Sequence, residues 1–176
     1  SDPVGLLPET GRVYNIPLTL LFASGFPTVA LGIAKASLNT AMELAGSKIP
    51  GRATRLLKDE STTQRIIGEA EAVWHSAKAF LREAHTSVWQ SATSKKPLTT
   101  EQRIKLRLAS TNGIRKATEI VGQAYEVCGS NAILTTNTIQ RKFQDIQVVS
   151  KHLQGRATHY ESAGPSFMGM EPQGNF

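Results

Sequence analysis

The sequence predicts an all-α protein, an up-down antiparallel four-helix bundle. Apolar residues recur at spacings of three and four over long stretches, whereas no strand-like alternation and no internal repeat stands out. Turn-forming residues separate these stretches at residues 46–55 and 95–98 and again at Gly129. A chain of 176 residues, 40% of them hydrophobic, fits one domain with a sizeable buried core.

The first helix is predicted to begin near Leu18 or Pro27 and to end near Leu44. Proline is compatible with the first turn of a helix and kinks a longer one, so Pro27 permits both starts. The spacing of apolar residues predicts an inner face made of Val29, Ile33, Ala36 and Leu44.

The second helix is predicted to run from Ser61, acting as its N-cap, to about Trp89. Its apolar residues return at spacings of three and four, as a single buried stripe requires. The members of that stripe are Ile66, Ala70, Val73, Ala77, Phe80, Ala84 and Val88.

The third helix is predicted to start at Thr99 or Thr100, either of which can cap it, and to continue to about Cys128. Gly129 is then placed to end this helix in a left-handed conformation, which glycine adopts without steric cost.

A fourth helix is predicted to begin near Asn137 or Thr138 and to carry His152. From Gly164 the composition turns to glycine, proline and methionine, which predicts a tail over residues 164–176. The apolar face of the helix is Ile139, Phe143, Ile146, Val149 and Leu153.

The uncharged run of residues 13–34 is long enough to cross a bilayer. Pro17, Pro27 and several polar residues interrupt it, which favours a buried segment leading into a bundle helix and predicts no membrane contact. Cys128 is the only cysteine, so no disulfide forms within the chain, and a cytoplasmic location is predicted.

The net charge of +6 raises the question of nucleic-acid binding. Seven basic residues lie between Lys95 and Lys116, but Arg103, Lys105 and Arg107 are spaced by two and spread around a helix axis. This spacing favours a solvated helix face over a nucleic-acid interface. Contact with a phosphate-bearing cofactor or an acidic partner subunit is a third interpretation.

Metal and nucleotide motifs are missing from the sequence, which has no HExxH, no Walker loop and no GxGxxG. On one continuous helix, His152 and His159 would lie roughly 10 Å apart, too far to share a zinc ion, so no metal site is predicted. Glu71 and His75 have the spacing of a surface pair. By residue type alone, a lone helical histidine such as His152 has a structural role more often than a chemical one.

Five segments, in this order and spacing, carry a family resemblance. They read GIAKASLNTAMELA, residues 64–84, RLASTNGIRKATEIVGQAYEVCGSNAI, IQRKFQDIQVVSKH and SFMGMEP. Together they resemble the C-terminal helical domain of the acyl-CoA dehydrogenase superfamily, and within it the oxygenase component of two-component, flavin-dependent monooxygenases. Two positions depart from the pattern, since Gln144 replaces an arginine and Glu126 replaces a glutamine.

One position separates the two branches of this superfamily. Many acyl-CoA dehydrogenases carry a glutamate base where this chain has Leu153, and no Asp or Glu occurs between Asp145 and Glu161. A leucine side chain cannot accept a proton. In the monooxygenase branch, a histidine at the place of His152 faces the aromatic substrate and the reacting edge of the flavin.

The resemblance also implies cofactor contacts at the turn formed by Gly129, Ser130 and Asn131, which in the family meets the flavin bound by a neighbouring subunit. A C-cap and tight turn explain the same small residues without any ligand. Either Arg52 or Arg55 would reach a flavin phosphate, as an arginine after the first long helix does in relatives.

The implied function is that of a flavin-dependent monooxygenase, a hydroxylase that uses reduced flavin (FMN or FAD) and O2 on an aromatic or similar small-molecule substrate. A separate flavin reductase would supply the reduced flavin, and the chain would form a homo-oligomer, a dimer or tetramer. His152 would orient or deprotonate the substrate hydroxyl, or stabilise the activated oxygen through a hydrogen bond.

Residues 1–176 are expected to form a single C-terminal bundle domain without the N-terminal helical and middle β domains of the family, and therefore to be inactive alone. Two alternatives stay open: an acyl-CoA dehydrogenase and, in another class, a non-catalytic helical assembly domain. In the second alternative, His152 is a core residue and Gly129 only a cap.

Overall fold

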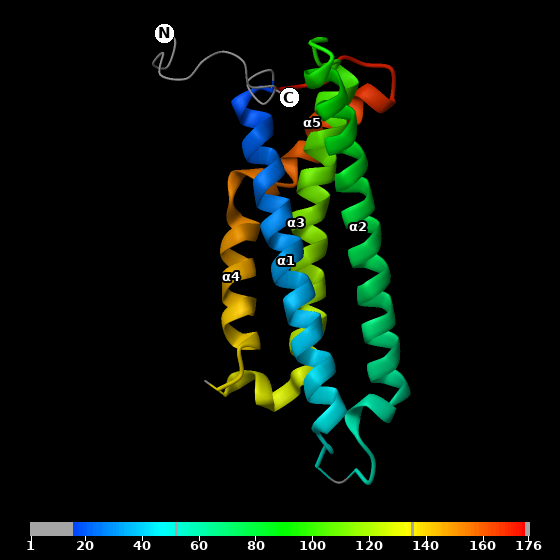
Figure 1. The fold of residues 1–176 in the computed structure, drawn as a ribbon, viewed down its shortest axis with the longest axis vertical. Helices are drawn as coiled ribbons and strands as arrows, with labels where there is room; N and C mark the ends of the chain where they lie inside the picture. Colours follow the sequence, from blue (N-terminus) through cyan, green and yellow to red (C-terminus); the bar gives the residue numbers. More distant parts are fainter. Residues whose placement is uncertain (1–15, 52, 135, 175–176) are drawn as a thin grey trace.

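The computed structural model describes residues 16–51, 53–134 and 136–174 and confirms the all-α prediction, since no strand occurs in this described part. Helices α1 to α4 run up and down beside one another, and α5 lies at the end of the bundle where α4 finishes (Figure 1). The elements are α1 (Leu18–Ser47), η2 (Leu57–Asp59), α2 (Ser61–Thr93), α3 (Thr100–Cys128), η3 (Gly129–Ile133), α4 (Ile139–Lys151), η4 (Leu153–Gly155) and α5 (Thr158–Phe167), where η marks a 3-10 helix.

Helix α1 starts at Leu18, the earlier of the two predicted starts, and continues through Pro27. Pro27 is buried against α3, where a Cβ atom on Gly113 would lie 3.1 Å from the Cβ of Pro27. The absence of a side chain at Gly113 therefore lets α1 and α3 approach closely.

The predicted inner face of α1 is wrong at Val29 and Ala36, which are exposed, while Ile33 and Leu44 are half-buried. The inner face combines leucines with small residues, which permit close packing on α3, and it lies on a different side of the helix from Val29 and Ala36. The buried residues are Leu20, Ala23, Pro27, Ala30, Leu31, Ala34, Ser37, Leu38, Ala41 and Ala45.

Helix α1 is also long and apolar enough to cross a membrane, with a mean hydropathy of 1.5 in its most apolar window. A third of that window (33%) is buried inside the bundle, and core helices of soluble proteins pass the same test.

Helix α2 carries the predicted stripe: Ala70, Ala77, Ala84 and Val88 are buried, and its other members are half-buried against the core. The helix begins at Ser61 with Glu60 in the N-cap position, so the prediction that Ser61 caps it is wrong.

Two contacts tie α2 to α1. The indole N–H of Trp74 donates to the Leu31 carbonyl at 2.9 Å, and Lys35 forms an ion pair with Glu71. The expected pair of Glu71 with His75 is present at 3.8 Å, on the exposed side.

Helix α3 lies at the centre of the bundle and packs against α1, α2, α4 and α5. Thr99 caps it as predicted, in a capping box with Gln102: the Gln102 N–H donates to the Thr99 hydroxyl at 3.2 Å, and the Thr99 N–H donates to the Gln102 amide oxygen at 3.0 Å. The helix ends at Cys128, and Gly129 follows with φ 55° and ψ −139°. This positive φ confirms the predicted need for glycine.

The basic residues of α3 do not form a stripe. Lys105 pairs with Glu83 of α2 at 2.6 Å, Lys116 pairs with Glu119 at 2.7 Å, and Arg107 is buried. This distribution is the one expected for a solvated helix with one side chain turned into the core.

The fourth helix differs from the prediction at its C-terminus. Helix α4 ends at Lys151, and His152 has the extended conformation φ −64°, ψ 152°. Leu153 is consequently 53% exposed rather than part of the apolar face, whereas Ile139 and Ile146 are buried as expected. His152 and His159 thus lie on different elements, and α5 continues past Gly164, the predicted start of the tail, to Phe167.

Candidate functional site

His152 is an exposed side chain held in a defined orientation directly after the C-terminus of α4. Its imidazole ring stacks on the ring of Phe26 of α1, with centroids 3.7 Å apart and 14° between the planes. Its Nδ1 accepts a hydrogen bond from the backbone N–H of Gln154 at 3.3 Å. Because Nδ1 is an acceptor, the neutral ring carries its proton on Nε2.

The surface beside His152 is apolar. Phe22 and Phe26 follow one another by a helical turn on α1, and Val29 continues the same face. Phe22 is 55% exposed and Val29 57% exposed, and Leu153 is exposed on the other side of His152 in the sequence. A planar aromatic group is the kind of ligand that such a surface fits.

Beneath this exposed surface lies a buried polar network. An Nη1–H of Arg107 donates to the side-chain oxygen of Gln154, and the hydroxyl of Thr111 donates to the Gln154 backbone carbonyl at 3.1 Å. The Thr111 oxygen also lies 2.8 Å from Nδ1 of His159. A hydroxyl has a single proton, so His159 is the donor in that second bond.

Burial lowers the pKa of both basic groups in the network. Desolvation lowers the pKa of Arg107, although a guanidinium stays charged in proteins. Desolvation is also the main reason why the pKa of His159 is lowered, and the positive charges of Arg107 and Arg156 lower it further. His159 is therefore neutral at neutral pH, with its proton on Nδ1.

The second predicted site, the turn Gly129, Ser130 and Asn131, begins the short element η3 directly after the C-terminus of α3. Gly129 and Ser130 are exposed. The Lys48 Nζ donates to the Cys128 carbonyl at 3.3 Å and lies 3.8 Å from the position of a Cβ atom on Gly129.

A second lysine lies near this turn. The Lys142 Nζ donates to the hydroxyls of Thr40 at 2.7 Å and Thr138 at 2.8 Å. Burial raises the pKa of the Cys128 thiol, and the charges of Lys48 and Lys142 oppose that rise. A groove of about 390 Å³ beside the turn includes Asn131 and Thr138, with the carboxylate residue Glu43 at its edge.

The structure does not bring the two predicted sites together. His152 follows the last residue of α4, and the Gly129 turn precedes its first residue, so the two lie at opposite ends of α4, which Figure 1 shows as the short fourth helix. Helix α4 has 13 residues. This length corresponds to a separation of roughly 20 Å.

The two arginines predicted to reach a flavin phosphate give different outcomes. Arg52 lies outside the described residues. Arg55 is exposed, and its Nε donates to the carboxylate of Glu60 at 2.9 Å. Among the described residues, no three His, Cys, Asp or Glu side chains are close enough together to hold a metal ion.

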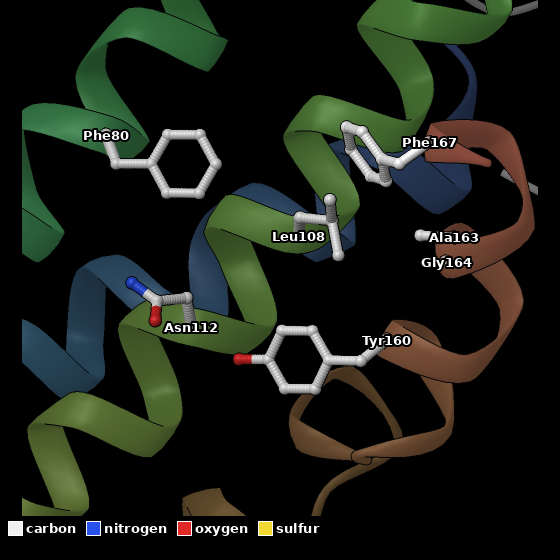
Figure 2. Close-up of a pocket in the computed structure, with 7 residues that line it drawn as sticks. All are labelled: Phe80, Leu108, Asn112, Tyr160, Ala163, Gly164 and Phe167. Atoms are coloured by element: carbon white, nitrogen blue, oxygen red, sulfur yellow. The ribbon is translucent and has the colours of Figure 1, made fainter.

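The sequence analysis missed one pocket, a groove of about 390 Å³ between α2, α3 and α5. Figure 2 shows the Tyr160 hydroxyl pointing toward Asn112 of α3, and burial raises the pKa of Tyr160. Interpreting residues from 164 onward as a tail concealed this groove, because part of its wall comes from the end of α5. It is lined by Phe80, Leu108, Asn112, Tyr160, Ala163, Gly164 and Phe167.

These residues are carried by an all-helical bundle whose long helices run up and down beside one another. The sequence profile of the family described as "Acyl-CoA dehydrogenase, C-terminal domain" matches residues 24–156, which is most of the chain. The chain belongs to this family.

Two curated relatives are oxygenases by name. The chain is 31% identical to the indole-3-acetate monooxygenase of Pseudomonas putida over 82% of this chain and 37% of that protein. It is 28% identical to the pigment production hydroxylase of Rhodococcus erythropolis over 94% of this chain and 42% of that protein. The chain therefore spans about two fifths of the length of these relatives.

Solved structures share the fold. The 3-HSA hydroxylase from Rhodococcus sp. superposes with a TM-score of 0.84 at 18% identity, over 94% of this chain and 43% of that one. XiaF from Streptomyces sp., in complex with FADH2 and glycerol, superposes with a TM-score of 0.83 at 18% identity, over 94% of this chain and 45% of that one. Dibenzothiophene monooxygenase from Paenibacillus sp., in complex with FMN and indole, superposes with a TM-score of 0.75 at 21% identity, over 88% of this chain and 40% of that one.

Proposed function

We propose that this chain is the C-terminal domain of a flavin-dependent monooxygenase that hydroxylates an aromatic or similar small molecule. The observation that carries the proposal is His152, exposed on an apolar surface and fixed from two sides by the Phe26 ring and the Gln154 N–H. The relatives with oxygenase names support the same branch of the family.

The hydrogen bond to Nδ1 specifies what His152 can do. With its proton on Nε2, the neutral ring donates a hydrogen bond to an oxygen atom placed over that nitrogen. Taking a proton from a substrate at Nε2 would require the opposite tautomer, which conflicts with the N–H of Gln154 at 3.3 Å. We therefore favour donation to an oxygen of the reacting group over abstraction of a substrate proton.

The residues present fit a flavin. The apolar face with Phe22 and Phe26 suits a planar ring system, and the Gly129 turn, with Lys48 and Lys142 nearby, suits a phosphate group. When bound, reduced flavin supplies the electrons that activate O2. FMN and FAD are both compatible with these contacts, and a separate reductase would deliver the reduced form.

The separation of the two sites supports an assembly. We propose that the chain forms a dimer or tetramer in which His152 serves one flavin and the Gly129 turn serves the flavin of a neighbouring subunit. A single chain holds these groups at opposite ends of α4, so an oligomer lets both contribute to catalysis.

The acyl-CoA dehydrogenase alternative needs a base, and no described residue between Asp145 and Glu161 has a carboxylate. Leu153 is apolar and exposed, and the first described carboxylate after α4 belongs to Glu161 of α5. The assembly-domain alternative treats His152 as a core residue, whereas the structure exposes it.

The test uses the full-length protein supplied with reduced flavin and candidate aromatic substrates. We expect His152→Ala, which removes one hydrogen-bond donor, to lower product formed per flavin oxidised by about 10²–10³-fold, with hydrogen peroxide released instead. His152→Gln, whose amide N–H replaces the Nε2 donor, should keep part of the coupling if donation is the role. His75→Ala, which removes an exposed histidine of α2, is the matched control; normal coupling in His152→Ala would contradict the proposal.

A further inference from the structure

We propose that Gln154, anchored by Arg107 and Thr111 of α3, is the positioning residue that holds His152 in its working orientation. The proposed role of His152 in oxygen transfer gives this anchor its function, so the inference rests on that proposal. The geometry of the anchor is independent of it.

Three polar groups of Gln154 each form a hydrogen bond with a different residue. Its backbone N–H donates to Nδ1 of His152, its backbone carbonyl accepts from Thr111, and its side-chain oxygen accepts from Arg107. The residue that fixes the imidazole is thus fixed in turn by two side chains of the central helix.

The anchor is buried, which makes it rigid. Gln154 and Arg107 are each only 6% exposed. Burying a polar group costs free energy unless the group is hydrogen-bonded. The arrangement in which every one of these buried groups has a hydrogen-bond partner is therefore strongly preferred. No described carboxylate pairs with Arg107, and the neutral amide of Gln154 is its recorded side-chain partner.

The backbone next to Gln154 is closely packed at Gly155. A Cβ atom on Gly155 would lie 2.9 Å from the Ser150 carbonyl oxygen and 3.0 Å from Cγ2 of Ile114. The Gly155 N–H donates to the His152 carbonyl at 2.9 Å. Gly155 is therefore packed directly onto α3 and α4, and Gln154 beside it is buried.

His159 completes the anchor from α5. Since the Thr111 proton goes to Gln154, the bond at 2.8 Å requires the Nδ1–H of His159 as donor. Thr111 therefore links α5 to the segment that carries His152.

The first experiment measures the position of His152 by NMR in this chain with ring-labelled histidines, of which there are four. Stacking on Phe26 should shift the His152 ring signals upfield; His152→Ala identifies them, and Phe26→Leu removes the shift. We expect Thr111→Val, which matches threonine in size, to move these signals toward the values of a free histidine. Ser110→Ala is the control, since this buried hydroxyl of α3 bonds only within its own helix, to Leu106.

Two substitutions of Gln154 itself sharpen the test. Gln154→Glu keeps an acceptor for Arg107 and should retain the His152 signals, whereas Gln154→Leu removes it and should displace them. Should Gln154→Leu fail to fold, the size-matched Thr111→Val decides the question. Unchanged His152 signals in Thr111→Val would overturn the proposal.

The second experiment measures coupling in the full-length protein. We expect Thr111→Val to lower the ratio of product to hydrogen peroxide several-fold, with Ser110→Ala near wild type and Gln154→Glu restoring what Gln154→Leu loses. Displaced NMR signals with normal coupling would retain the anchor and refute the role of His152. Lost coupling with His152 still in place would show that Thr111 does not act through His152 and would overturn the positioning role.

Discussion

The two ends of α4 fix their exposed groups by different means. At the His152 end, the orientation depends on Phe26, Arg107 and Thr111, which lie far away in the sequence on α1 and α3. At the other end, the turn depends on the backbone conformation of Gly129 itself, with φ 55°, and lysines approach it from the side. The first arrangement is cooperative and buried, whereas the second is local and exposed, and substitutions should therefore have different consequences at each end.

The largest expected effect on stability is at the His152 end. Gly155→Ala places a methyl group against the Ser150 carbonyl and Ile114, and we expect it to lower the free energy of unfolding by about 1–3 kcal/mol. Chemical denaturation measures the change. Gly122→Ala, in an open position of α3, should instead leave stability equal or slightly higher. An unchanged midpoint for Gly155→Ala would show that the segment has more freedom than the contacts indicate.

A smaller effect is expected at the opposite end. Gly129→Ala forces a side chain into a positive-φ conformation, which costs about 1–2 kcal/mol. The strain is local, so the His152 ring signals should stay in place while flavin retention by the full-length protein weakens. Gly46→Ala, near the end of α1 with no atom within 4 Å, serves as control. Movement of the His152 signals would mean that the two ends are coupled.

The smallest expected effect is a pH dependence from the buried histidines. The pKa values of His159 and His85 are lowered from 6.5 in the folded state, chiefly by burial, so the unfolded chain binds more protons just below pH 6.5. Stability contributed by these groups is therefore present above pH 6.5 and is lost as pH falls through the folded pKa values. Urea unfolding between pH 5.5 and 7.5 should show this slope, and His159→Gln should reduce it. A slope that His159→Gln leaves unchanged would contradict the lowered pKa.

The difference between the two ends of α4 also explains which features could be predicted from the sequence. Gly129 and Thr99 were predictable because a helix end needs particular residue types within a few positions. His152 was found through its family position, but the sequence placed it inside a helix. Helix α4 ends before it because Gln154 is held by residues 43 and 47 positions away, and no local pattern reports such contacts.

The buried face was predicted correctly for α2, which has one side in water, and incorrectly for α1, which packs closely against α3. The apolar stripe of α2 was predicted correctly because one side of that helix faces solvent and carries polar residues. On α1, Pro27 packs closely against Gly113 of α3 and alanines form much of the buried face, so Val29 was assigned to the wrong face. The cytoplasmic location and the role of Arg52 stay predictions.

The central claim is that the two ends of one chain serve different active sites. The direct measurement combines two full-length variants that are each inactive alone, His152→Ala and Gly129→Glu, in one oligomer isolated with two affinity tags. If a site takes His152 from one subunit and the glycine turn from another, some sites in the mixture contain both native halves and hydroxylation returns. A mixture of His152→Ala with the double variant should stay inactive. Mixed oligomers of the two single variants that are as inactive as their parents would contradict the claim.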